Sequence, residues 1–339
     1  MKSTALLAAA ALALAAAGFG PTAQAAGPGY TIAQRIAGPD GFWDYVSFDA
    51  AHHRVYVSHG DAIMTIDAAT GTVNPHFADA SRSHAVLPLN GGKQLLTTNS
   101  GDNTARIFNA DTGALEATIA TANDADGAAY DPFSRHVFVV DGDAGEITVI
   151  DLAAHKAVTS IKAGTPLEFA APDGKGRLYV NEEEKNAVAV IDTRTNTILK
   201  TYPLPGCMRP TGLAWAAPGL TISSCGNGLA VVLNARTGKL VASLKIGQGP
   251  DAVIPDPAHH RVFIPSGRDG TLALLTISPK GVVKVAATAA TQMGARTGAL
   301  DSTTGKIYLP TARFTPPTAP GQRPGLVPGS FEVLVMAPG

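Results

Sequence analysis

One pattern recurs seven times along the chain, and this internal repeat constrains the fold more than any other feature. In each copy a polar residue opens an apolar stretch, a hairpin turn follows, and a strand with an aromatic residue comes next. The first copy runs through Asp44–Asp49 and then His52–Val57. Successive copies start 40, 42, 42, 43, 40 and 45 residues apart, and their opening residues are Asp44, His84, Asp126, Glu168, Thr211, Asp251 and Arg296. A regular period of this length indicates a repeat architecture.

Each repeat holds four short strands. A second strand is clear in Arg135–Val140, a third ends in a pair such as Ile66-Asp67 before a Thr-Gly turn, and a fourth alternates as in Ala157–Lys162. Alternation, β-branched residues and Gly, Asn or Asp turns are typical of antiparallel hairpins. Four strands per unit predict an all-β, seven-bladed β-propeller with four-stranded antiparallel blades. The 36 Gly and 24 Pro fit this frequency of turns, and we find no helical periodicity beyond the first 25 residues.

The two ends of the repeat region complement each other. The last repeat stops after a third strand, Phe331–Met336, while the stretch Tyr30–Ile36 precedes the first repeat and reads as a fourth strand. We therefore expect residues 26–339 to form a single propeller domain, closed as a ring by the N-terminal strand joining the last blade. Closure would remove the free sheet edges that promote aggregation.

Residues 1–25 resemble an export signal. Lys2 supplies the positive start, Ala5–Ala17 the apolar run, and Ala23-Gln24-Ala25 a cleavage site of the A-x-A type. The apolar run is shorter than the roughly 20 residues that span a bilayer. This pattern predicts a periplasmic or secreted protein without a membrane span after signal removal, and we expect a monomer.

The strand cores also carry a family resemblance. Val55-Tyr56-Val57-Ser58 and Leu178-Tyr179-Val180-Asn181 resemble the YVTN-type repeat, and the Ile-Asp-x-x-Thr-Gly turn at Ile66–Gly71 is similar to that of exported bacterial YncE-like propellers. Ser223, Pro265 and Pro310 interrupt the tetrad. The resemblance implies a seven-bladed propeller and says little about activity, because propellers perform many functions. The resemblance also implies single-stranded DNA binding as an alternative role, but the net charge of -1 and the acidic opening residues argue against it.

The opening residues predict a polar ring at one mouth of the central channel, because each lies at the start of an innermost strand. The ends of the second strands return to the same face 13 to 15 residues later and predict a second ring, made of His59, Asn99, Asp141, Asn181, Cys225, Ser266 and Thr311. We name the two sets the inner ring and the outer ring. Together they are the candidate ligand-binding residues.

Three interpretations of the inner ring remain open. In the first, the ring is a solvated channel mouth whose carboxylates bind water. In the second, it is a binding site for a small molecule, an ion or an envelope protein. In the third, it is a metal-assisted active site. In the last case Asp44, His84, Asp126, Glu168 and Asp251 are the candidate ligands of a divalent cation, and the protein is a lactonase or lyase. We find no catalytic motif of fixed spacing, which favours a non-catalytic binding protein and leaves the catalytic residues unassigned.

Cys207 and Cys225 are the two cysteines of the chain. Cys207 precedes the first strand of the fifth repeat and Cys225 ends its second strand, so both fall on the ring face of one blade. In an oxidising compartment this placement predicts a disulfide.

Two further features lie outside the rings. His52-His53 and His259-His260 occupy the same context between first and second strands of different repeats, which places them on the opposite face and suggests common repeat ancestry. The proline-rich segment 315–329 interrupts the last repeat. It reads either as a lid or partner-contact surface over the mouth or as a tolerated insertion.

Overall fold

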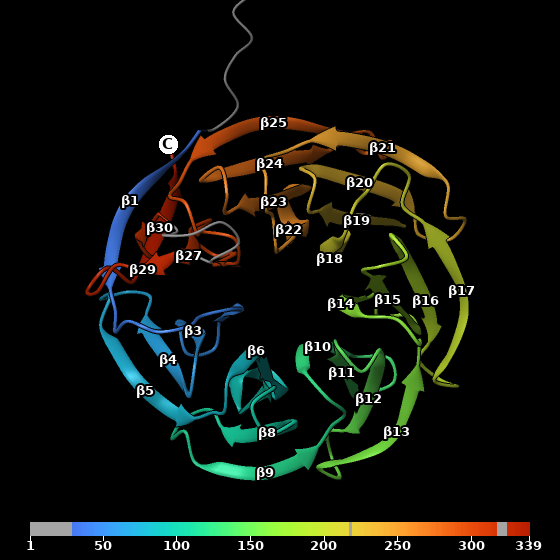
Figure 1. The fold of residues 1–339 in the computed structure, drawn as a ribbon, viewed down its shortest axis with the longest axis horizontal. Helices are drawn as coiled ribbons and strands as arrows, with labels where there is room; N and C mark the ends of the chain where they lie inside the picture. The colour runs from blue at the N-terminus through green and yellow to red at the C-terminus, as the bar shows by residue number, and fades with distance from the viewer. Residues whose placement is uncertain (1–28, 217–218, 317–323) are drawn as a thin grey trace, which may run out of the picture.

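The propeller predicted from the repeats is confirmed. The computed structural model describes residues 29–216, 219–316 and 324–339, so the signal-like residues 1–25 lie outside them. Seven four-stranded antiparallel sheets surround a central channel, and a two-stranded hairpin accompanies the last blade (Figure 1). The described residues include two 3-10 turns, η1 (Asn90–Gly92) and η2 (Pro257–His259).

The blades follow one another in chain order, and within blades 1 to 6 each strand pairs with the next. Blade 1 consists of β2 (Val46–Asp49), β3 (Arg54–His59), β4 (Ala62–Asp67) and β5 (Val73–Asp79). Blade 2 consists of β6 (Ser83–Leu89), β7 (Gln94–Asn99), β8 (Thr104–Asn109) and β9 (Leu115–Ala120). Blade 3 consists of β10 (Ala125–Asp131), β11 (His136–Asp141), β12 (Glu146–Asp151) and β13 (Lys156–Lys162).

The second half continues the pattern. Blade 4 consists of β14 (Leu167–Pro172), β15 (Arg177–Glu182), β16 (Ala187–Asp192) and β17 (Thr197–Pro203). Blade 5 consists of β18 (Pro210–Ala216), β19 (Leu220–Cys225), β20 (Leu229–Asn234) and β21 (Leu240–Lys245). Blade 6 consists of β22 (Ile254–Asp256), β23 (Arg261–Ser266), β24 (Thr271–Ile277) and β25 (Val283–Ala290).

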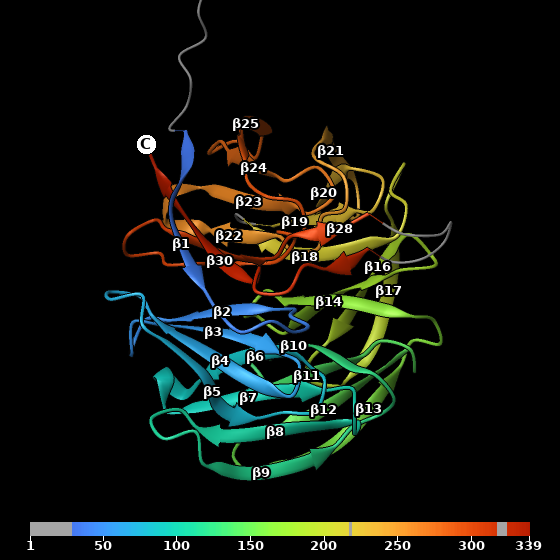
Figure 2. The ribbon, with the colours of Figure 1, turned by 60° about the vertical axis from the view of Figure 1, so that its left-hand side comes forward.

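Blade 7 closes the ring as the sequence predicts. Its strands are β26 (Ala299–Leu300), β27 (Ile307–Thr311), β30 (Glu332–Pro338) and β1 (Tyr30–Ala37), in the spatial order β26-β27-β30-β1. The N-terminal strand β1 pairs antiparallel with β30, from Tyr30 opposite Pro338 to Ala37 opposite Glu332. Figure 2 shows the two strands lying together at the junction of the chain's ends.

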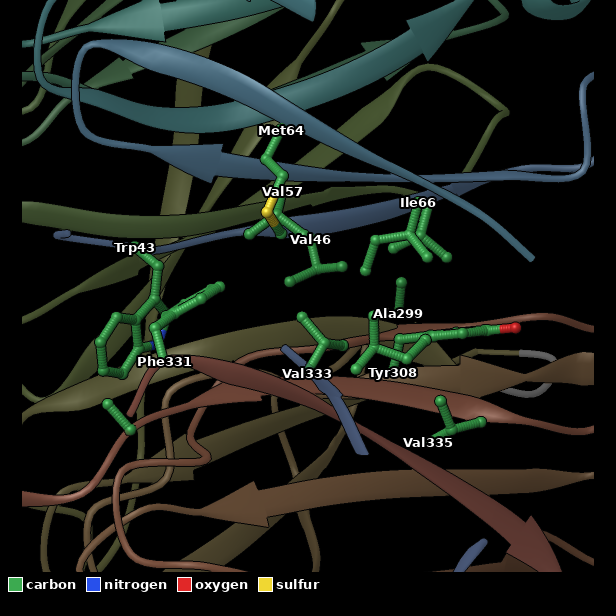
Figure 3. Close-up of a cluster of buried hydrophobic side chains, with 13 residues drawn as sticks. Trp43, Val46, Val57, Met64, Ile66, Ala299, Tyr308, Phe331, Val333 and Val335 are labelled. Atoms are coloured by element: carbon green, nitrogen blue, oxygen red, sulfur yellow. The ribbon is translucent and has the colours of Figure 1, made fainter. Parts of the chain in front are cut away.

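The core lies between neighbouring blades. The second and third strands are buried almost throughout, whereas fourth strands such as β13 and β17 expose most of their residues. At the closure, Val57 and Met64 of blade 1 pack with Tyr308 and Val333 of blade 7 (Figure 3). Fully burying one large apolar side chain contributes about 1.5–3 kcal/mol, so this contact favours the closed ring. No helix in the described part of the chain is long and apolar enough to cross a membrane.

Candidate functional site at the channel mouth

The inner-ring residues lie at the entrance of the first strands. His84, Asp126, Glu168 and Thr211 are the second residues of β6, β10, β14 and β18, whereas the other three precede their strands by two or three residues. Hydrogen bonds between blades fix their backbone: Ser58 donates to the His84 carbonyl, Thr98 to the Asp126 carbonyl, and Thr297 to the Asp44 carbonyl. The mouth is therefore built as part of the contact between blades.

Asp44, His84 and Asp126 converge, and we call them the mouth cluster. Nδ1 of His84 lies 2.6 Å from Oδ2 of Asp44 and 3.4 Å from Oδ1 of Asp126, and Nε2 lies 2.9 Å from Oγ of Ser100. Although burial lowers the pKa of His84, its hydrogen bond to Asp44 and the charge of Asp126 outweigh burial and raise this pKa. Burial and the charge of Asp44 raise the pKa of Asp126.

Arg296 ties blade 7 to this cluster. Its Nε donates to Oδ2 of Asp251 at 2.7 Å, and its Nη2 lies 3.7 Å from Oδ1 of Asp44. Burial raises the pKa of Asp251 in spite of the opposing effect of Arg296. Burial and the charges of Asp126 and Asp251 raise the pKa of Glu168 well above its ordinary value. The mouth thus holds more carboxyl groups than cations.

Tyr45 and Phe169 close the channel beneath the ring. Their rings stack across the channel from blades 1 and 4, with centroids 4.4 Å apart. Burial and the charges of Asp126, Asp44, Glu168 and Asp251 raise the pKa of Tyr45 well above its ordinary value. The stack also lines a second, mostly apolar cavity of about 340 Å³ that continues along the first strands. The stack therefore joins blades 1 and 4 across the channel at the level where this apolar cavity begins.

A larger cavity of about 1100 Å³ opens on the ring face between blades 4 to 7 and the segment that leads into blade 1. We call it the mouth cavity. Four inner-ring residues line it, Glu168, Thr211, Asp251 and Arg296. Its apolar lining consists of Phe42, Trp43, Met208, Met293, Phe314, Pro324 and Leu326. Met208 and Met293 are more than 60% exposed. The cavity therefore combines apolar and charged surfaces.

The outer ring is placed at the strand ends as expected, but its side chains are buried and engaged internally. Asn181 donates to the Thr211 carbonyl at 2.6 Å, and Asp141 accepts from the Thr148 hydroxyl at 2.7 Å. Asn99 accepts from the Ser81 amide, Thr311 donates to the Met293 carbonyl, and His59 packs on Phe331. Ser266 is fully buried and Cys225 is in the disulfide. These residues support the mouth from below and do not line the mouth cavity.

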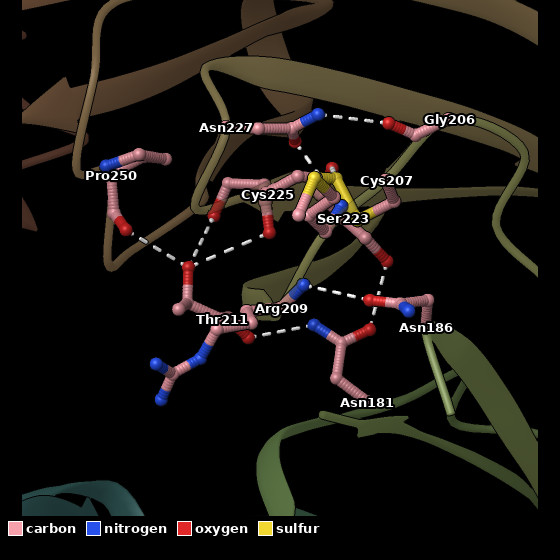
Figure 4. The surroundings of a disulfide bond; sticks show 12 residues. Asn181, Asn186, Gly206, Cys207, Arg209, Thr211, Ser223, Cys225, Asn227 and Pro250 are labelled. Atoms are coloured by element: carbon pink, nitrogen blue, oxygen red, sulfur yellow. Dashed lines mark hydrogen bonds between the residues drawn. A yellow bond between two sulfur atoms is a disulfide. The ribbon is translucent and has the colours of Figure 1, made fainter. Parts of the chain in front are cut away.

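The structure joins Cys207 and Cys225 in a disulfide, with Cα atoms 5.4 Å apart (Figure 4). The following loop is held on both sides, because the Met208 amide donates to Asn227 and the Arg209 amide donates to Asn186. The bridge therefore stabilises the part of the cavity wall that carries Met208.

The proline-rich segment reaches the mouth at its described ends. β28 (Phe314–Thr315) pairs with β29 (Gly325–Leu326), and both strands contribute to the mouth cavity. Gly294 leaves room for this hairpin, because a Cβ there would lie 2.6 Å from the Phe314 ring. Residues 317–323 of the segment lie outside the described residues.

Sequence reasoning missed the apolar half of the site. Tyr45 and Phe169 directly follow inner-ring residues, whereas Ala85, Gly127 and Gly212 take the same position in other repeats. Two aromatic residues among small ones could have indicated a contact across the channel. Phe42, Met208 and Met293 precede the ring residues by two or three positions, and nothing in the repeat singles them out.

The comparisons with known proteins agree with this architecture. The chain is 24% identical over 184 residues to the uncharacterized protein YncE of Salmonella typhi and to that of Salmonella typhimurium, a match that covers 51% of this chain and 51% of each relative. This likeness agrees with the resemblance of the repeats to YncE-like propellers. The chain spans about half the length of the curated relatives it matches, and no family model matches it.

Solved structures show the same fold at low identity. A virginiamycin B lyase from Staphylococcus aureus has a TM-score of 0.71 at 12% identity, and the match covers 91% of this chain and 99% of the lyase chain. U3-55K has a TM-score of 0.74 at 11% identity, covering 91% and 99%. Kuenenia stuttgartiensis hydrazine synthase has a TM-score of 0.70 at 14% identity, covering 81% and 92%. At this level of identity, these matches show that the chain has a propeller fold and do not indicate an activity.

Proposed function

We propose that this protein is a binding protein that holds a small organic molecule in the mouth cavity. The observation that carries the proposal is a cavity of about 1100 Å³ that combines apolar walls with ring carboxyls and three arginines, Arg209, Arg268 and Arg296. A few fixed polar groups inside a largely apolar cavity are typical of small-molecule sites, whose volumes run to about 1,000 Å³.

The charges in the cavity support a ligand with an apolar body and a hydrogen-bonding end. Arg209 pairs with Glu183 and Arg296 pairs with Asp251, so these two arginines are already neutralised. Within the described residues Glu168 has neither an ion-pair nor a hydrogen-bond partner, which leaves its carboxyl free for a ligand. Two of the three arginines that line the cavity are paired with carboxylates, and the third is Arg268, so the cavity offers few free cations for the phosphates of single-stranded DNA.

Ligand screening tests the proposal. We expect some members of a library of small aromatic and aliphatic molecules with one polar group to raise the melting temperature of the purified protein. A ligand at 100 times its Kd adds about 2.7 kcal/mol of stability. Met208→Glu and Met293→Glu should abolish the shift without unfolding the protein, because both side chains are exposed. Leu115→Glu, at an exposed position of β9 away from the cavity, is the matched control.

Two results would contradict the proposal. Hits that stabilise the two methionine variants as well as the unchanged protein would place their site elsewhere. A library without any hit would favour the solvated-mouth interpretation.

We also propose that the protein acts after export, in the periplasm or outside the cell, as a monomer. The signal-like residues 1–25 and the Cys207–Cys225 disulfide support this location, because disulfides persist in oxidising compartments. Mass spectrometry of the protein from the periplasmic fraction should find a chain that begins at residue 26. A full-length chain in the cytoplasmic fraction would contradict export.

A further inference from the structure

Three consecutive blades each contribute one possible metal ligand to the mouth cluster. One donor atom from each of Asp44, His84 and Asp126 can be chosen so that all three lie within 4.8 Å of one another. Bonds of 2.0–2.2 Å from nitrogen or oxygen to a transition metal require ligand atoms no more than about 4.4 Å apart. A shift of a few tenths of an ångström therefore suffices for all three to reach one ion.

Hydrogen bonding prepares His84 to use Nδ1 as the ligand atom. The Ser100 hydroxyl donates to the Arg82 carbonyl at 3.3 Å, so its oxygen accepts the Nε2–H of His84 at 2.9 Å. This contact keeps one proton on Nε2, so the proton that a metal ion displaces is the one on Nδ1, which faces the two carboxyls. A hydrogen bond from the second ring nitrogen is the usual support for a metal-binding histidine.

Asp126 supplies a buried acceptor that the described residues leave unsatisfied. Its Oδ1 is buried and has no hydrogen-bond partner among them, although it lies 3.4 Å from Nδ1 of His84. Buried polar atoms normally have a partner, and an ion is one of the groups that can provide it. This atom is on the side of the carboxyl that faces the cluster.

The charge around the cluster also favours a cation. The charges of Asp44, Asp126, Glu168 and Asp251 all act on the Tyr45 hydroxyl, and Arg296 contacts two of these residues, Asp44 and Asp251. When a divalent ion replaces the proton on Nδ1 of His84, that proton passes to solvent and the excess of negative charge falls. Arg296 opposes the ion through its 3.7 Å contact with Asp44, but its shorter contact is with Asp251.

We propose that Asp44, His84 and Asp126 bind one divalent transition-metal ion at the edge of the mouth cavity. One imidazole and two carboxylates suit ions such as Zn²⁺, Mn²⁺ or Co²⁺ better than Ca²⁺, which prefers six or more oxygen ligands. The site borders the cavity, because Phe42, a cavity residue, packs edge-on against the His84 ring at 5.6 Å. The proposal rests on the cluster alone and stands whether or not a small molecule binds.

Zinc titration of the full protein tests the site. The untagged protein is stripped with a chelator, titrated with Zn²⁺ by calorimetry, and analysed for bound metal after gel filtration. We expect one Zn²⁺ per chain, and we expect binding to weaken as the pH falls because the ligands must be deprotonated. Ser100→Ala, which removes the support of Nε2, should weaken binding roughly 10- to 100-fold. Asp126→Asn and His84→Gln should weaken it by at least that factor.

His52→Gln is the matched control, because His52 also contacts two aspartates but lies on the opposite face. It should leave the stoichiometry and the Kd unchanged. His84 is buried, so the Ser100 and Asp126 variants decide the test if His84→Gln fails to fold. No bound zinc, zinc binding that Ser100→Ala and Asp126→Asn leave unchanged, or tighter binding of Ca²⁺ than of Zn²⁺ would overturn the proposal.

Discussion

The two faces of the propeller each carry one histidine between two aspartates, in opposite arrangements. In the mouth cluster both carboxyls approach the same nitrogen, Nδ1 of His84. In the second set, which we call the opposite-face cluster, Asp49 lies 2.7 Å from Nδ1 of His52 and Asp111 lies 2.7 Å from Nε2. The two clusters therefore contain the same residue types in different geometries. In the mouth cluster the three side chains can share one ion, whereas in the opposite-face cluster the imidazole ring lies between the two carboxyls.

Burial separates the two clusters further. The side chains of the mouth cluster are 9–18% exposed, whereas in the opposite-face cluster Asp49 is 3% exposed, His52 is 23% exposed and Asp111 is 70% exposed. A charge pair in water contributes little because solvent screens it, but a buried charge that loses its partner is costly. Position in the repeat creates this difference: the ring residues enter the channel at the start of the first strand, while His52 lies in the turn after β2. The comparison predicts unequal responses to the same kinds of substitution.

The largest effect should come from removing one carboxylate of each cluster. Asp44→Ala leaves His84 and Arg296 without their common partner in a buried site, and we expect a loss of about 3–5 kcal/mol in unfolding free energy. Asp111→Ala should cost less than about 1 kcal/mol. Urea denaturation measures both. Equal losses would show that the clusters do not differ in burial and pairing.

The next largest loss of stability should come from removing the disulfide of blade 5, a blade that contributes to neither cluster. Replacing Cys207 and Cys225 with alanine opens a loop with a sequence separation of 18 and should lower stability by about 3 kcal/mol. Because blade 5 contributes to neither cluster, the difference between Asp44→Ala and Asp111→Ala should persist in this background. A difference that vanishes in the double-alanine background would mean that the disulfide holds the mouth cluster in place.

The repeat pattern was sufficient to predict the fold. Each blade buries its second and third strands against its neighbours. Runs of apolar residues such as Val55–Val57 therefore indicate which strands are buried. The last repeat ends after its third strand, Phe331–Met336, and Tyr30–Ile36 has the alternation of a fourth strand. The ring closure could therefore be predicted from the strand pattern as well. These features depend on local alternation, which a sequence displays.

The site could be predicted only in outline. The repeat placed Asp44, His84 and Asp126 at one mouth, but it could not tell that both carboxyls reach Nδ1, because that depends on side-chain rotation and on Ser100. It named the outer-ring residues as candidate ligand-binding residues, but could not tell that side chains such as Asn181 are used in contacts between blades. The mouth cavity arises from loops outside the repeat, including the hairpin at Phe314, whose position depends on tertiary contacts.

A smaller effect should come from the hydrogen bonds that fix the cluster's backbone. Thr297 is buried and donates to the Asp44 carbonyl at 2.6 Å, so Thr297→Val should cost about 1–2 kcal/mol. The Thr70 hydroxyl donates to the carboxylate of the exposed Asp67 within a single turn, and Thr70→Val should cost less than about 0.5 kcal/mol. Thermal unfolding of the two variants compares them. A larger loss for Thr70→Val would contradict the structural role assigned to the contacts between blades.

The smallest effect concerns salt. A double-mutant cycle between His52 and Asp111 should give a coupling of about 0.5 kcal/mol at low ionic strength that disappears near 1 M NaCl, because the Debye length falls to about 3 Å. The coupling between His84 and Asp44 should change much less, since solvent ions do not enter a buried contact. A strong salt dependence of the His84–Asp44 coupling would indicate an open, hydrated mouth.

The convergence of two carboxyls on one nitrogen is the central claim, and a crystal soaked in Zn²⁺ tests it most directly. Data collected at the zinc edge should show one strong anomalous peak bonded to Nδ1 of His84 and to both Asp44 and Asp126, at roughly 2.0–2.2 Å from each ligand atom. The opposite-face cluster should show none. A peak at His52 with an empty mouth cluster, or no peak at either cluster, would contradict the account.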